Sequence, residues 1–445
     1  MSYVVALPEM MSAAATEVAS IGSAVATANQ GVAGATTGVL AAAEDEVSAA
    51  IAALLSAHGQ GYQALSAQAS AFHEEFVQLL TGASGAYAAA EVANASPLEA
   101  FVAGVARVSN YLVTEIIGAP AAPPFPATLD GTFTGVPSII NRLEYAALYP
   151  VKPLLALSGL ETAISMPNNP LLQLLASDIP PLSWFIGNSP PPLLNLLLGE
   201  TVQYTSYNGM SVVQITPAHP TGEYVVAIHG GAFIFPPSFL HWINYSVTAY
   251  QTGATFEVPI YPLLQQGGTA GTVVPQMAGF ISSQIAQHGS SNVSVIGDSA
   301  GGNLALAAVE RIVSLGDPVP SRMVLLSPWL DLGMTNPNIA FVQDPLLPLG
   351  PAQQIGRIWA GNLAINDPMV SPLYGSLAGL PPTYVYSGNL DILSPDVFRL
   401  QDFAVVQNAP ISFVLANGQI HDWLILTLDG LRYWPQINQE LGIAA

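Results

Sequence analysis

The chain has 445 residues, of which 51% are hydrophobic and only 8% are charged, so it can bury a large core in more than one domain. This composition excludes an intrinsically disordered protein, which needs low hydrophobicity and high charge. The formal net charge of −21 argues against nucleic-acid binding, because a polyanion is repelled by phosphate backbones. The absence of cysteine excludes disulfides, thiol nucleophiles and cysteine-bound metals.

Residues 1–96 predict a long helical hairpin. They contain one proline, Pro8, whereas residues 97–200 contain fifteen, and proline-free, alanine-rich sequence favours helix. Apolar residues recur in steps of three and four from Met11 to Val39 and again from Val47 to Leu79. We therefore expect two antiparallel helices of about 35 residues each. Their alanine- and valine-rich seam leaves apolar surface uncovered, which predicts a helical partner chain.

The hairpin resembles the mycobacterial PE family in Pro8-Glu9, in its length and in the pattern Tyr87-x-x-x-Glu91. The resemblance implies that Tyr87 and Glu91 belong to a type VII secretion signal. It also implies export to the cell wall, the cell surface or beyond, after synthesis in the cytoplasm. A PPE-type helical partner or secretion chaperone would bind the hairpin. The amino terminus lacks the features of a cleaved signal peptide, and no stretch is apolar enough for a transmembrane helix.

Residues 97–200 are rich in proline. Residues 97–149 include APAAPPFPA and are predicted to form a linker. Residues 150–200 alternate short leucine-rich pieces with prolines. These pieces would form a cap or lid over an apolar cleft, or else fill the core ahead of the first strand, and the sequence leaves both readings open.

From residue 201 to residue 445 the pattern predicts an α/β domain. Residues 201–207 and 210–216 predict a β-hairpin joined at Asn208-Gly209. Further short, β-branched runs separated by helical stretches predict a mostly parallel central sheet. These runs are 224–228, 293–296, 323–326 and 383–386.

The segment around Ser299 predicts a nucleophile. An apolar strand leads directly into Gly297-Asp298-Ser299-Ala300-Gly301 and then into a helix. This strand–turn–helix context is that of a nucleophile elbow, in which Gly297 and Gly301 avoid collisions at a tight turn. The serine hydroxyl would stand above a helix amino terminus, where N–H groups favour developing negative charge.

A second motif, His229-Gly230-Gly231-Ala232, follows the predicted strand 224–228. Backbone without side chains at a strand end can approach an oxyanion and donate hydrogen bonds to it. The expected oxyanion donors are the N–H groups of Gly230, Gly231 and Ala300. His229 is expected to brace this loop rather than to transfer protons.

A serine nucleophile needs a base and an orienting acid. His421 is the only histidine after Ser299 and is therefore the expected base. Asp391, which follows a predicted strand, is the favoured acid. The alternatives are Asp396, Asp367 and Asp422, although Asp422 is expected to point away from the histidine along an extended loop. No metal-ligand cluster occurs in the sequence, so neither a metal nor a cofactor is expected.

These motifs, together with Asp391-Ile392-Leu393 and Ile420-His421-Asp422, resemble the hormone-sensitive-lipase group of α/β-hydrolases over residues 201–445. Ala232 departs from the group, in which many members have a third glycine. The whole chain resembles the PE-domain triacylglycerol lipases, which implies hydrolysis of long-chain triacylglycerols and other carboxylic esters. Two alternatives stay open: an esterase for short, soluble esters, or a surface interaction protein with a vestigial hydrolase domain.

Overall fold

A computed structural model describes residues 8–92, 120–149, 152, 166, 168–179 and 182–443. The chain divides into two compact units, residues 1–112 and residues 113–445. Among the residues described, no helix is both long enough and apolar enough to span a lipid bilayer.

The first unit contains two antiparallel helices, α1 (Pro8–Thr37) and α2 (Glu46–Val92). The Tyr62 hydroxyl donates to Asn29 Oδ1 across the hairpin at 2.9 Å. The pairing confirms the predicted hairpin, although α2 has 47 residues and is longer than expected. The Asp45 carboxylate accepts the Ser48 N–H at 2.8 Å, which satisfies a free donor at the start of α2.

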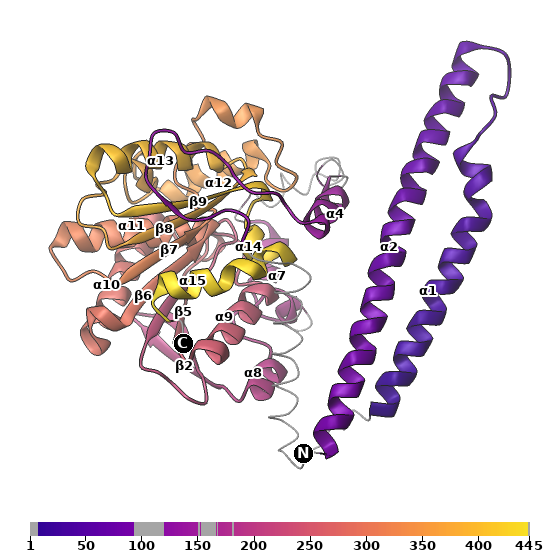
Figure 1. The fold of residues 1–445 in the computed structure, drawn as a ribbon. Coiled ribbons are helices and arrows are strands. Elements are labelled where there is room, and N and C mark those ends of the chain that lie inside the picture. The colour runs from indigo at the N-terminus through magenta and orange to yellow at the C-terminus, as the bar shows by residue number, and fades with distance from the viewer. Residues whose placement is uncertain are drawn as a thin grey trace. The chain divides into compact units, whose positions relative to one another are not determined.

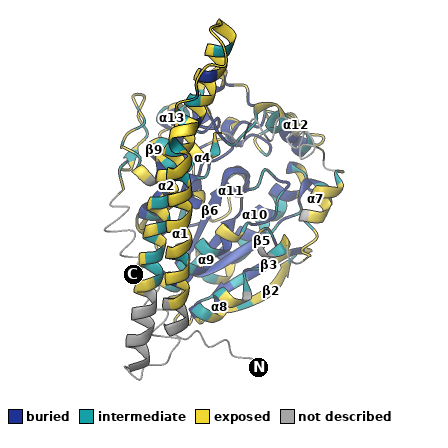
Figure 2. Ribbon diagram, turned by 90° about the vertical axis from the view of Figure 1, so that its right-hand side faces the viewer, coloured by how far each residue is buried: buried dark blue, intermediate teal, exposed yellow. Residues whose placement is uncertain are grey.

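The apolar seam of the hairpin is largely exposed. Ile21, Val25 and Val32 are 60%, 53% and 49% exposed, whereas the small side chains of Ala15 and Ala52 are buried. Figure 2 shows the same pattern, since exposed and intermediate residues run along α1 and α2 while the central strands of the second unit are buried. The two helices thus touch through small residues and leave their larger apolar side chains uncovered.

The second unit is built on a nine-stranded sheet in the order β1-β9-β8-β7-β6-β4-β5-β3-β2. Pairing is parallel from β5 through to β9 and antiparallel at both edges. The strands are β1 (Phe125–Pro126), β2 (Thr201–Tyr207), β3 (Met210–Thr216), β4 (Tyr224–Ile228), β5 (Thr255–Ile260), β6 (Val293–Asp298), β7 (Arg322–Leu326), β8 (Thr383–Leu390) and β9 (Ile411–Ile420). The predicted α/β domain with a mostly parallel sheet is confirmed.

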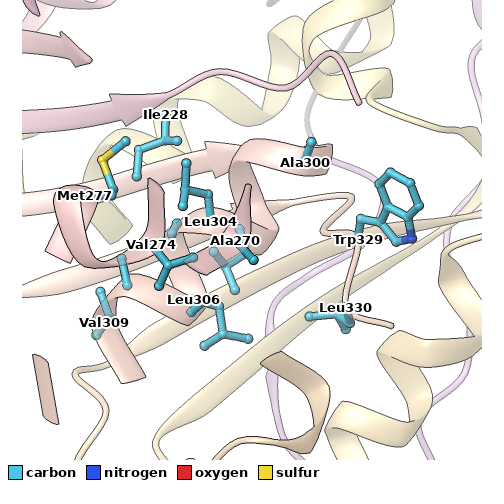
Figure 3. Packing of buried hydrophobic residues seen from close by; sticks show 14 of the residues in the cluster. Ile228, Ala270, Val274, Met277, Ala300, Leu304, Leu306, Val309, Trp329 and Leu330 are labelled. Atoms are coloured by element: carbon cyan, nitrogen blue, oxygen red, sulfur yellow. The ribbon is translucent and has the colours of Figure 1, made fainter. Parts of the chain in front are cut away.

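Helices cover both faces of this sheet (Figure 1). They are α4 (Ile139–Leu148), α7 (Pro170–Leu175), α8 (Pro192–Leu198), α9 (Phe239–Thr252), α10 (Ala270–His288), α11 (Ser299–Leu315), α12 (Leu349–Ala360), α13 (Ser394–Gln407), α14 (Trp423–Leu426) and α15 (Trp434–Leu441). Side chains alternate across a strand, so Val226 of β4 packs with α10 and α11, whereas Val225 packs with α9 and α15. Figure 3 shows Val274 and Met277 of α10 close to Leu304 of α11 in the first of these cores.

The predicted strands of the α/β domain all occur, and the β2–β3 hairpin turns at Asn208 and Gly209, whose φ angles of 47° and 83° suit a type I′ turn. Strand β5 was not predicted, because Glu257 and Pro259 interrupt its apolar pattern.

Residues 120–149 are not a linker, which corrects that prediction for the part of 97–149 that the structure describes; residues 97–119 lie outside it. Strand β1 pairs with β9 at the edge of the sheet. The N–H groups of Ala121 and Ala122 donate to the Tyr433 hydroxyl at 3.0 and 2.9 Å. The prolines that suggested a linker are compatible with an edge strand, where a missing N–H costs little.

Residues 168–179 and 182–200 pack in part against the rest of the second unit, to which they belong. Leu172 of α7 is fully buried in its core. Asn195 of α8 donates to the Ser246 hydroxyl of α9 at 3.1 Å. Most of residues 150–167 lie outside the described part, so a cap or lid over 150–200 stays a prediction.

Candidate active site

The turn between β6 and α11 holds Ser299 in a strained conformation. Its φ of 50° lies in the left-handed region, which non-glycine residues rarely adopt. A Cβ at Gly297 would lie 2.5 Å from the carbonyl oxygen of Gly301, and a Cβ at Gly301 would meet the carbonyl of His229 at 2.6 Å. Both glycines are therefore required by close backbone packing, as the sequence predicted for an elbow.

Three distant segments bring Ser299, His421 and Asp391 into one hydrogen-bonded chain. His421, at the end of β9, places Nε2 2.8 Å from the Ser299 Oγ. Its Nδ1 lies 3.0 Å from Asp391 Oδ2, at the end of β8. All three residues are buried. The predicted nucleophile, base and acid thus meet at the carboxyl edge of the parallel strands.

Asp391 is held by its own backbone, because its Oδ1 accepts the Leu393 N–H at 2.8 Å. Two of the three alternative acids, Asp396 and Asp367, make other contacts. Asp396, in the first turn of α13, accepts from Asn336 and Arg399. Asp367 accepts the Met369 N–H within its own loop. Their contacts are those of structural carboxylates.

Asp422 does not point away from His421, which corrects the expectation for this residue. Strand β9 ends at Ile420, and Asp422 has a left-handed φ of 50°. Its Oδ2 consequently lies 3.1 Å from His421 Nε2, on the side that faces Ser299. The expectation was wrong because it assumed extended backbone at Asp422, whereas the backbone turns into the left-handed region there.

The protonation of His421 is set by opposing effects. Burial lowers its pKa, but the carboxylates of Asp422 and Asp391 raise the pKa well above the usual histidine value. Burial also raises the pKa of Asp422, to about 6, and the nearby charge of Asp298 acts in the same direction. The carboxylates of Asp422 and Asp391 thus both favour the protonated form of the His421 imidazole.

The Gly230 N–H is not available to an oxyanion, so its predicted role as a donor is wrong in this structure. It donates to Asp298 Oδ2 at 2.9 Å. The same carboxylate oxygen lies 3.0 Å from His241 Nε2, and His241 Nδ1 contacts the Ser238 hydroxyl at 2.7 Å. Asp298, the variable position of the elbow motif, thus ties the loop at 230 to helix α9.

The N–H groups of Gly231, Ala232 and Ala300 remain as possible oxyanion donors. Ala300 lies in the first turn of α11, where N–H groups have no carbonyl partner within the helix. Gly231 and Ala232 have left-handed φ angles of 106° and 53°. The sequence analysis did not name Ala232 as an oxyanion donor. Its position, three residues after His229 where many members of the group have a third glycine, was the signal that could have identified it.

Aromatic packing holds the loop that carries these groups. Phe233, also left-handed, is fully buried and stacks on Trp359 of α12 at 3.8 Å between ring centroids. His229 stacks on Tyr261 at 4.4 Å. Burial lowers the pKa of His229 to about 4, so its ring is neutral near pH 7. These contacts fit the expected role of His229 as a support of the loop.

No group of three or more His, Asp or Glu side chains in the described ranges is arranged to hold a metal ion.

The fold and these motifs define an α/β-hydrolase. Residues 225–425 match the family model described as "alpha/beta hydrolase fold", and residues 4–94 match that of the PE family. The chain is 69% identical to a triacylglycerol lipase of Mycobacterium tuberculosis over the full length of both proteins. The chain belongs to the family of this lipase, and it joins a PE domain to an α/β-hydrolase domain.

Further relatives match one part of the chain each. The PE-PGRS family protein PE_PGRS33 of M. tuberculosis is 57% identical over 120 residues, which are 27% of this chain and 25% of that protein. An esterase from the bacterial hormone-sensitive lipase family has a similar fold, with a TM-score of 0.50 and 24% identity over 56% of this chain and 88% of that one. An esterase/lipase from an uncultured bacterium has a TM-score of 0.50 and 20% identity over 61% and 96%.

Proposed function

We propose that the protein hydrolyses carboxylic esters with Ser299 as nucleophile, His421 as general base and Asp391 as the acid that orients the imidazole. The hydrogen-bonded chain from Ser299 Oγ through His421 to Asp391, with distances of 2.8 and 3.0 Å, carries this proposal.

The proposed reaction passes through an acyl-enzyme. Ser299 Oγ attacks the ester carbonyl carbon while its proton moves to His421 Nε2. The N–H groups of Gly231 and Ala300, with that of Ala232, stabilise the oxyanion. His421 then returns the proton to the alcohol oxygen as the C–O bond breaks. A water molecule then attacks the carbonyl carbon of the acyl-enzyme while one of its protons moves to His421. Transfer of this proton to Ser299 Oγ releases the carboxylic acid and restores Ser299.

The proposed substrates are long-chain triacylglycerols. The full-length similarity to a triacylglycerol lipase supports this choice, as does the shortage of charge in a chain with 8% charged residues, because acyl chains prefer apolar surroundings. The alternative of short, soluble esters predicts higher kcat/KM for short acyl chains. A profile of activity against acyl length on the full-length protein separates the two.

We also propose that the PE hairpin carries export to the cell surface and binds a helical partner of the PPE type. Its exposed apolar residues, such as Ile21 and Val25, support a partner. Tyr87 and Glu91 lie near the end of α2, where the secretion pattern was recognised. Replacing both by alanine in the native host should retain the protein inside the cell, and export at the wild-type level would contradict this role.

The decisive experiment compares the full-length protein with Ser299→Ala on emulsified long-chain triacylglycerol. We expect release of fatty acid by the wild type and a loss of at least about 10⁴-fold in the variant. A fluorophosphonate probe should label the wild type at Ser299. Turnover by Ser299→Ala would refute the nucleophile, and an unlabelled, inactive wild type would favour a vestigial hydrolase.

A further inference from the structure

Asp422 occupies an unusual place next to the proposed base. His421 Nδ1 is already paired with Asp391, while Nε2 lies 2.8 Å from Ser299 Oγ and 3.1 Å from Asp422 Oδ2. The other carboxylate oxygen, Oδ1, is buried and has no hydrogen-bond partner among the described residues. The Asp422 side chain is 12% exposed, and among the described residues its closest charged contact is His421 Nε2.

This contact requires a proton. A neutral imidazole that donates Nδ1–H to Asp391 has only a lone pair at Nε2. A lone pair and an ionised carboxylate oxygen repel each other at hydrogen-bond distance. Either His421 is an imidazolium that donates Nε2–H to Asp422, or a protonated Asp422 donates to Nε2. In both forms Nε2 cannot accept the proton of Ser299.

We propose that Asp422 is a positioning residue that keeps an additional proton on the His421–Asp422 pair of the free enzyme, so that hydrolysis begins only as rising pH removes this proton. The inference rests on the proposed roles of Ser299 and His421. Once the additional proton has left to solvent, the Nδ1–H group of His421 still donates to Asp391. Nε2 can then accept the Ser299 proton as the bond between Oγ and the ester carbon forms.

The surroundings of the pair favour retention of this proton. Five titratable groups face it from four elements or loops, namely Asp391 after β8, Asp298 at the end of β6, Asp344 before α12, and His241 and Tyr245 on α9. Three of these five are carboxyl groups. Negative charges near His421 stabilise the imidazolium, and the pair titrates as a unit with macroscopic pKa values.

The test is the pH dependence of kcat/KM for a soluble p-nitrophenyl ester, which reports ionisations of the free enzyme. The full-length wild type is compared with Asp422→Asn, which removes the negative charge at nearly constant shape, and with Asp422→Glu, which keeps it. Asp402→Asn, an exposed carboxylate on α13, controls for net charge. Absorbance is read at the isosbestic wavelength of p-nitrophenol.

We expect the acidic limb of the wild-type profile to have its midpoint above about pH 6.5, the usual histidine value. Asp422→Asn should lower this midpoint by about one pH unit or more, since a lost opposite charge at this distance shifts a pKa by about one to three units. Asp422→Glu and Asp402→Asn should retain the high midpoint.

Equal midpoints in the wild type and Asp422→Asn would overturn the inference. If Asp422→Asn does not fold, as judged by circular dichroism, a wild-type midpoint at or below pH 6.5 overturns it instead. Ser299→Ala, measured in parallel, separates the two proposals. Activity in that variant rejects the proposed function, whereas an inactive Ser299→Ala with an unshifted Asp422→Asn rejects only the role of Asp422.

Discussion

The two units of the molecule differ in how much of their apolar surface they bury. In the hydrolase unit, neighbouring residues of one strand, such as Val225 and Val226, are both fully buried because helices cover both faces of the sheet. In the hairpin, Ile21 and Val25 remain more than half exposed. A sheet between two layers completes its own core, whereas two helices in contact through alanine and glycine cannot.

The same division holds for chemistry. Every residue proposed for catalysis lies between His229 and Asp422, in the hydrolase unit. The hairpin contributes no Lys or Arg, since residues 1–106 contain none. Activity and partner binding should therefore respond to different substitutions, and each substitution below is designed to affect one unit alone.

The largest effect is expected from Asp391→Asn. A neutral amide at this position does not stabilise the positive charge of the His421 imidazolium, and it favours the wrong tautomer of the neutral ring. We therefore expect kcat to fall by about 10⁴-fold. The change is measured by steady-state hydrolysis of a p-nitrophenyl ester, with an unchanged circular dichroism spectrum as the control for folding.

Asp367→Asn is the matched control, because this carboxylate was the alternative acid with a contact inside its own loop. It should keep activity within a few-fold of the wild type. A deep loss in Asp367→Asn together with an active Asp391→Asn would reverse the assignment of the acid.

The elements that bring Ser299 and His421 together could be predicted because their signals are local. A buried strand, a Gly-x-Ser-x-Gly turn and an apolar helix face stand within residues 293–312, and only one histidine follows them. Asp391 could be predicted as the acid because it follows a predicted strand, and the carboxyl ends of parallel strands lie at one edge of the sheet.

The features that could not be predicted depend on contacts between distant segments. The Gly230 N–H donates to the carboxylate of Asp298, which lies sixty-eight residues later in the sequence. The approach of Asp422 to His421 Nε2 depends on a left-handed φ at Asp422, and the sequence does not indicate this conformation because the residue is not a glycine. The docking of residues 120–149 depends on partners such as Tyr433, about three hundred residues away. Local pattern carries no information about such pairs.

A smaller but clear contrast is expected between a core substitution and a substitution at an exposed position. Leu304→Ala removes a fully buried side chain of α11 and should lower the free energy of unfolding by about 2–5 kcal/mol. Ile21→Ala, at a position 60% exposed, should change it by no more than about 0.5 kcal/mol. All six tryptophans lie at residue 184 or later, so their fluorescence during urea unfolding reports on the hydrolase unit alone. A fluorescence midpoint shifted by Ile21→Ala would show that the two units are coupled.

The smallest effect is expected from removal of the first unit, residues 1–112, which holds no group of the proposed site. Its kcat/KM for soluble esters should stay within about twofold of the full-length value, as expected for independent domains. Removal of residues 1–149 should behave differently, because it also deletes β1 and α4. On α4, the Tyr145 hydroxyl donates to Gln419 Oε1 at 2.9 Å and accepts the Ile420 N–H at 3.2 Å, directly before His421. The longer truncation should therefore lose activity or stability that the shorter one retains. Equal activity in both would mean that α4 does not hold the histidine, and a loss in both would mean that the hairpin unit supports the hydrolase after all.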